Sequence, residues 1–111
     1  MTPVPSKRDG RIAEAEVGFA VLQILANSAG GVASVDTLKS KLPNHVELSE
    51  VDKNPSDTRP NEKIWEQQIR NLKSHDTTVG NIFKEGFVEQ ASKGVWRITD
   101  AGRLHLENGG R

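Results

Sequence analysis

The segment GVWRITDAGR, residues 94–103, constrains the fold of this chain more than any other part of the sequence. Its first half combines β-branched and aromatic residues, which favour a β-strand. Thr99 or Asp100 then offers a helix N-cap directly before a short helical pattern. A preceding run, FVEQ at 87–90, is separated from this strand by the four residues ASKG, a connection that suits a hairpin. The sequence therefore predicts a two-stranded antiparallel ribbon followed by a short helix.

The pairing of this ribbon decides which side chains reach the core. Aligning Gln90 with Val95 puts Phe87 opposite Ile98. Trp96 and Ile98 then share a face with Phe87, and we expect that face to be buried. The helix after the ribbon is expected to dock through Leu104, with Leu106 as a further candidate. A slip of one residue would exchange the two faces, so the register is a sharp test of the pattern.

Three helical patterns precede the ribbon. Residues 11–28 repeat apolar side chains at about 3.5-residue spacing. Residues 34–42 begin with a serine that is a good N-cap. The clearest pattern covers 61–75, with Asn61 as its expected cap. Val32 is expected to add one small strand between the first two helices.

Residues 44–60 separate the second and third helical patterns and have loop composition, including the run DKNPSDTRPN. Four acidic side chains and one lysine lie within 44–58, so this stretch carries a formal charge of −3. Long loops in small domains are uncommon and often functional. Two interpretations stay open: a solvated connector, which the composition favours, or a contact surface.

The charge balance bears on the class of partner. The chain has 15 basic and 15 acidic side chains, which argues against a strong nonspecific nucleic-acid binder. The charge is unevenly spread, because residues 1–11 and residues 59–103 each carry a formal charge of +2. A local basic face is therefore compatible with zero net charge, provided that the acidic loop points elsewhere.

The 111 residues suffice for one domain. We expect a flexible arm over 1–10, a domain over 11–108 and the start of a linker over 109–111. No apolar run approaches the roughly 20 residues of a membrane span, and the first residues lack the apolar stretch of a signal peptide. The expected location is the cytoplasm. Cysteine is absent, which excludes disulfides.

The residue pattern offers no support for catalysis. His45, His75 and His105 lack the spacing of metal ligands. The run EVDK at 50–53 looks like part of an acidic nuclease motif, but it lies in a proline-flanked loop. No glycine-rich phosphate loop occurs. The chain is therefore predicted to be a binding domain with no catalytic residue, no metal and no cofactor.

Helix, short strand, helix, helix and β-hairpin is the order of a winged helix-turn-helix, an α+β fold with a three-helix core, a two- to three-stranded antiparallel sheet and, here, a short C-terminal helix. Within that order, KIWEQQIRNLKSH, GNIFKEGFVEQ and KGVWRITDAGR resemble the N-terminal winged-helix domain of Mrr-type restriction endonucleases. Trp65, 86–89 and 94–103 carry the resemblance. Similar domains are attached to other modification-dependent nucleases of prokaryotes.

The resemblance implies a module that binds double-stranded DNA and delivers a separate nuclease domain. Methylated or otherwise modified DNA is the hypothesis for its target. In a winged helix the third helix usually lies in the major groove, and the wing contacts an adjacent groove or the backbone. The candidate DNA contacts are Asn61, Lys63, Trp65, Glu66, Gln67, Arg70 and Lys73 on the third helix, Ser74, His75, Thr77 and Thr78 after it, and Ser92, Lys93 and Arg97 on the wing.

These candidates differ in what they offer a duplex. The Gln67 amide suits adenine, and the Arg70 guanidinium suits guanine. Glu62 and Glu66 repel phosphate and must be kept off the backbone. Trp65 is more typical of core packing, with an aromatic wall for a methylated base as the alternative.

A second hypothesis assigns the chain to the protein-interaction or dimerisation modules, which zero net charge favours, and its oligomeric state stays open. A free-standing enzyme is the least favoured class. The DNA hypothesis makes a geometric demand: Arg70 and Lys93 must face the same side, and the loop over 47–57 must leave that side open.

Overall fold

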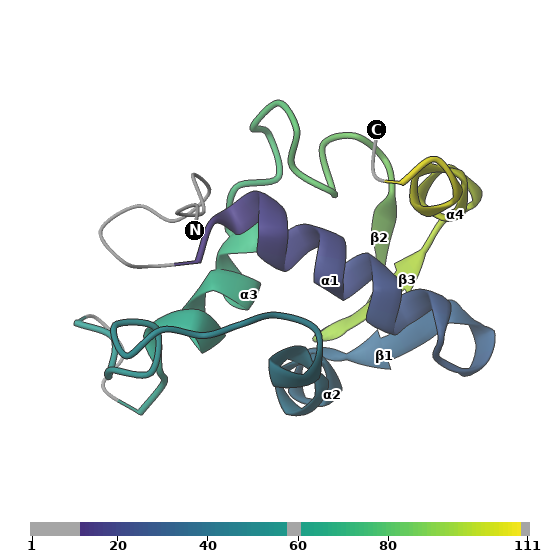
Figure 1. Ribbon diagram of the computed structural model, residues 1–111. Helices are drawn as coiled ribbons and strands as arrows, with labels where there is room; N and C mark the ends of the chain where they lie inside the picture. Colours follow the sequence, from purple (N-terminus) through teal and green to yellow (C-terminus); the bar gives the residue numbers. More distant parts are fainter. Residues whose placement is uncertain (1–11, 58–60, 110–111) are drawn as a thin grey trace.

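The computed structural model describes residues 12–57 and 61–109 (Figure 1). The expected flexible arm over 1–10 lies outside these residues. The described elements are, in chain order, α1 (Glu14–Ala26), β1 (Val32–Ser34), α2 (Val35–Lys41), α3 (Ile64–Ser74), β2 (Val88–Ser92), β3 (Val95–Ile98) and α4 (Asp100–Glu107), with 3₁₀ turns at Ala29–Gly31 and Leu42–Asn44.

These elements form an α+β domain around one antiparallel sheet of three strands, in the order β1-β3-β2. Helix α1 crosses in front of the sheet and contacts α2, α3, α4 and β3 (Figure 1). The core lies between α1 and these elements. Its fully buried side chains include Val17, Leu22 and Leu25 of α1, Leu38 of α2, and Ile69 and Leu72 of α3.

The sheet confirms the predicted ribbon and corrects its register. Trp96 and Ile98 are buried as expected, but Gln90 lies opposite Trp96 rather than Val95. The predicted register was wrong because β2 runs on to Ser92 and contains a bulge that accommodates one extra residue. Val88, which is buried, therefore lies opposite Ile98 in place of the predicted Phe87.

Local caps explain where two of the helices begin. The Ser34 hydroxyl accepts a hydrogen bond from the Thr37 amide at 3.1 Å, as a serine N-cap should. The Thr99 hydroxyl accepts one from the Gly102 amide at 3.1 Å, so Thr99 rather than Asp100 caps α4. Both helices thus start where the sequence predicts, because their caps are local signals.

Helix α3 begins later than the sequence predicts. Its N-cap is Lys63, not Asn61, and the Glu66 carboxylate accepts a hydrogen bond from the Lys63 amide at 2.7 Å. The residues before it are held by the preceding loop, since the Ser56 amide donates to the Glu62 carbonyl at 2.8 Å. This nonlocal contact keeps them out of the helix and leaves Glu66, not Glu62, in the first turn.

Helix α4 packs on the ribbon differently from the expectation. Leu104 is 57% exposed, so the predicted docking through this residue is wrong, whereas Leu106 is partly buried against the core. The close approach occurs at Gly102, where an added Cβ would lie 2.8 Å from Ile98 Cγ1 and 3.1 Å from the Phe87 carbonyl carbon. Glycine at this position therefore lets α4 lie against the ends of β2 and β3.

We expect Gly102→Ala to lower the free energy of unfolding by about 1–3 kcal/mol, because the new methyl group meets backbone that cannot move aside cheaply. Leu104→Ala in the same helix is the matched control and should cost only about 0.5 kcal/mol. Urea titration followed by circular dichroism measures both. Equal losses for the two variants would contradict this account of how α4 docks.

Candidate functional site

The described surface has a groove of about 500 Å³ between α2, α3 and the β2–β3 hairpin. We call it the basic groove. Its lining residues are Ser34, Val35, Asp36 and Lys39 from the α2 end, Arg70, Lys73 and Ser74 from α3, and Gln90, Lys93, Gly94, Val95 and Trp96 from the hairpin. Four of these side chains are cationic, and Asp36 is the single carboxylate among them.

The hairpin is fixed to α2 at the edge of this groove. The Val35 amide, at the start of α2, donates a hydrogen bond to the Gly94 carbonyl at 2.8 Å. Gly94 has a φ of 71°, a left-handed conformation that lets the chain turn back there. Lys93 is consequently held on the same groove as Arg70, which meets the first part of the geometric demand made by the sequence.

Arg70 and Lys39 share an intramolecular partner, Glu62. The Arg70 Nη2 atom lies 2.6 Å from Glu62 Oε2, and Lys39 Nζ lies 2.7 Å from the same oxygen. The hydrogen bond from Arg70 lowers the pKa of the Glu62 carboxyl to about 2, against the opposing effect of burial, and Lys39 acts in the same direction as Arg70. Glu62 in turn raises the pKa of Arg70. The Arg70 guanidinium, which was expected to pair with guanine, is therefore bound to the carboxylate of Glu62.

The acidic loop is anchored to the rest of the domain, although Glu47, Glu50 and Asp57 on it are exposed. The Asp52 side chain is fully buried; its Oδ1 accepts from the Ile12 amide at 2.8 Å and its Oδ2 from the Ser49 amide at 2.9 Å. The Trp65 amide donates to the Asp52 carbonyl at 3.1 Å, and the Ser56 hydroxyl donates to Gln67 Oε1. The loop is therefore held against the first turn of α3, and both interpretations of it, connector or contact surface, stay predictions.

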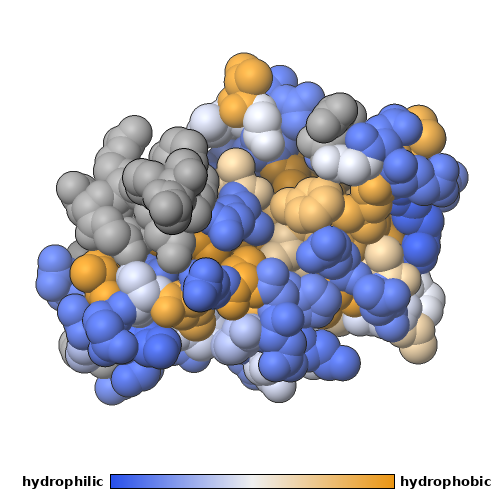
Figure 2. Space-filling view, viewed as in Figure 1, coloured by the Kyte–Doolittle hydropathy of each residue, from blue (hydrophilic) through white to orange (hydrophobic). Residues whose placement is uncertain are grey.

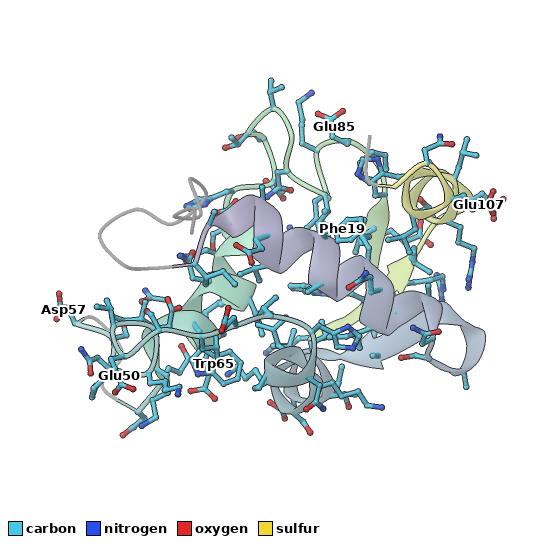
Figure 3. All side chains as sticks on the ribbon, in the orientation of Figure 1. Phe19, Glu50, Asp57, Trp65, Glu85 and Glu107 are labelled. Atoms are coloured by element: carbon cyan, nitrogen blue, oxygen red, sulfur yellow. The ribbon has the colours of Figure 1, made fainter. Side chains whose placement is uncertain are left out.

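The outward face of α3 is thus divided. Its first turn meets the loop, and Gln67, the expected partner of adenine, is hydrogen-bonded there. Arg70, Lys73 and Ser74, in the second half of the helix, line the basic groove. Figure 3 shows Glu50 and Asp57 of the loop at the same end of the molecule as Trp65, which is partly buried against the core.

The other candidates lie apart from the basic groove. His75 Nδ1 lies 2.7 Å from Glu14 Oε1, on the far side of α3. Arg97 is paired with Glu89 at 2.8 Å on the exposed face of the sheet. Thr78 lines a different groove. Four remaining candidates are exposed and do not line the basic groove, namely Asn61, Lys63, Thr77 and Ser92.

Sequence reasoning missed Lys39 and Gln90 as lining residues, and it treated Glu62 only as a source of repulsion. No local pattern distinguishes Lys39 from its neighbours on α2. The one available signal is the fold order, which places the second helix of such a domain beside the third.

Lys73, which was predicted, is also paired with Asp76 at 2.8 Å and lies 5.7 Å from the centre of the Phe83 ring.

A second groove, of about 1160 Å³, lies between α1, the segment 75–87 and α4. We call it the apolar groove. Phe19, Leu22, Ile82 and Phe87 line it, and Figure 3 places Phe19 on α1 in the middle of this face. Figure 2 shows apolar side chains gathered there in the same view.

Two other kinds of site are absent from residues 12–57 and 61–109. No group of three or more His, Cys, Asp or Glu side chains among these residues could hold a metal ion. No helix in the same residues has both the length and the apolar character needed to cross a membrane.

Fold and site together define a small α+β domain with a cation-lined groove between two helices and a hairpin. The chain belongs to the Mrr N-terminal domain family, whose model matches residues 16–108, and this family is associated with Mrr restriction systems. The resemblance noted in the second half of the sequence is confirmed, and the match extends into the first half as well. No curated protein and no solved structure shows a match to the chain.

The Glu62 pairs predict how stability depends on pH. Because the folded-state pKa of about 2 lies below the usual value of 4.5, the pairs stabilise the fold above about pH 4.5 and lose that effect as the pH falls towards 2. We expect Glu62→Gln to lower the free energy of unfolding by about 1–2 kcal/mol at neutral pH. The loss is no larger because the Arg70 side chain is 43% exposed, and solvent screens its interaction with Glu62.

Urea titrations between pH 2 and pH 7 measure this effect. The wild type should lose stability over the acid range more steeply than Glu62→Gln, and the two curves should converge near pH 2. Parallel curves over the whole range would show that Glu62 is not the group responsible.

Proposed function

We propose that this domain is a winged helix-turn-helix that binds double-stranded DNA through the basic groove and so directs a restriction-type nuclease. On this proposal it is a binding domain and not a catalytic one. The observation that carries the proposal is the convergence of four cations, from α2, α3 and the hairpin, on one groove. Such a group of cations attracts the phosphates of DNA, and the release of the phosphates' counterions drives binding.

The order of elements supports the winged-helix interpretation, with α3 as the recognition helix and β2–β3 as the wing. The contact differs in one respect from the usual arrangement, in which the first residues of the recognition helix touch the bases. Here the loop is held against those residues, so the end of α3 faces the duplex. Arg70, Lys73 and Lys93 are the proposed phosphate contacts on α3 and the wing, with Lys39 beside them.

Selection of methylated or otherwise modified DNA is the finer part of the proposal. It is supported by the association of the family with restriction systems. Trp65 packs against the core and does not line the basic groove, so we assign it to packing and not to recognition of a modified base. The apolar groove, with Val79 85% exposed on it, favours a second candidate function, the docking of another protein.

Fluorescence anisotropy with short labelled duplexes tests DNA binding, using unmodified, adenine-methylated and cytosine-methylated versions of one sequence across a salt series. We expect Kd values of about 1–100 μM at low salt, weakening as salt rises. A Kd above about 1 mM for every duplex at low salt would reject the proposal. A light-scattering mass above that of the monomer, without DNA binding, would favour protein docking instead.

The basic groove makes a specific prediction for Lys93. Lys93→Gln should weaken binding to all sequences alike and reduce the slope of log K against log salt by about one, because one phosphate contact is lost. Lys84→Gln removes the same charge from an exposed position outside the groove and is the control. Equal effects of the two variants would mean that net charge, and not the groove, governs binding.

A further inference from the structure

We infer that Lys39 and Arg70 form a phosphate-binding site whose place is taken, in the free protein, by the carboxylate of Glu62. A phosphate of the duplex displaces this carboxylate when DNA binds. The inference rests on the proposed DNA-binding function and deepens it by assigning one contact and the group that competes for it.

The geometry of the Glu62 carboxylate is that of a bound anion. Its Oε2 lies 2.6 Å from Arg70 Nη2 and 2.7 Å from Lys39 Nζ, and its Oε1 accepts from Arg70 Nε at 3.3 Å. Arg70 therefore presents its Nε–Nη2 edge to two oxygens of one group. This is the two-pronged arrangement with which arginine binds phosphate as well as carboxylate. A lysine from a neighbouring helix completes the site.

The site can be reached from the basic groove. Lys39 and Arg70 both line that groove, and the Arg70 side chain is 43% exposed. Glu62 is 12% exposed and precedes α3, whose first residue is Ile64. The carboxylate can thus leave by rotation of the Glu62 side chain, which unwinds no turn of α3 and keeps the hydrogen bond from the Ser56 amide to the Glu62 carbonyl.

Competition between the two anions has a consequence for selectivity. A carboxylate and a phosphodiester each carry one negative charge, so the exchange leaves the charge around the two cations unchanged. Displacement of the carboxylate by a phosphate therefore contributes little to the free energy of DNA binding. Most of that free energy must come from other contacts with the duplex, such as those of Lys73 and Lys93. Glu62 therefore suppresses weak, purely electrostatic binding and favours duplexes that fit the whole groove.

The experiment compares Glu62→Gln with wild type by the same anisotropy titration. We expect the variant to bind an unmodified duplex about three- to tenfold more tightly, with a salt slope steeper by about one, because Lys39 and Arg70 then meet phosphate without the Glu62 charge. Asp36, which also lines the groove, is present in both proteins and does not affect the comparison. Glu50→Gln makes the same chemical change at an exposed position of the loop and should leave the affinity as it is. Circular dichroism confirms that each variant is folded at the temperature used.

A cycle of substitutions ties the effect to the two cations. In a background carrying Lys39→Gln and Arg70→Gln, Glu62→Gln should give no gain, because its partners are gone. In the wild type, the ¹⁵N–¹H signal of Arg70 Nε should shift on titration with the duplex, as it should when Glu62 is replaced by glutamine. Both readouts respond to the exchange itself and not to stability.

The outcomes separate this inference from the function on which it rests. Binding of the wild type with an unchanged or weaker affinity for folded Glu62→Gln would overturn the inference and leave DNA binding intact. An equal gain from Glu50→Gln would also overturn it, since bulk charge would then explain the effect. Failure of both wild type and Glu62→Gln to bind any duplex would reject the proposed function itself.

Discussion

The buried carboxylate of Asp52 is the contact on which the arrangement of the other elements depends. A fully buried charge must be compensated by hydrogen bonds, and this one accepts from the amides of Ile12 and Ser49. The same residue accepts through its carbonyl from the amide of Trp65. One loop residue thereby joins the residues before α1 to the start of α3. Because the loop is held at both points, it fixes where α3 begins and which part of its surface is left for a partner.

This constraint explains how a chain of zero net charge presents a basic groove. The acidic loop residues Glu50 and Asp57 lie at one end of the molecule, beside the first turns of α3 (Figure 3). The cations of the groove come from the end of α3 and from elements that pack farther along it. Fields of exposed charges are screened over about 8–10 Å in physiological salt, so a partner in the groove senses mainly the local charge. Net charge alone is a poor guide to partners in a molecule built this way.

The elements that sequence predicted well are those set by local signals. The Ser34 and Thr99 caps and the buried face of β3 depend on side chains within a few residues of one another. The features that it missed are nonlocal. The start of α3 moved because of hydrogen bonds to residues near Ser56, and the ribbon register shifted because a bulge before Ser92 takes up a residue. Neither these hydrogen bonds nor the bulge produces a periodic pattern of residues in the sequence.

The candidate site follows the same division. Fold order alone was enough to place Arg70 and Lys93 on one groove, since the third helix and the hairpin are neighbours in this topology. Pairing with Glu62 was not predictable, because that residue lies outside the helix and reaches Arg70 only after the loop has fixed the stretch before α3. The hairpin, by contrast, is held to α2 by the hydrogen bond from the Val35 amide to the Gly94 carbonyl, which involves no partner. On the proposed function, the groove is therefore organised in advance at its hairpin side, and the ordering cost of DNA binding falls on the Glu62 side. On the same proposal, a change at the Glu62 carboxylate adjusts the affinity for DNA, and the cations themselves need no change.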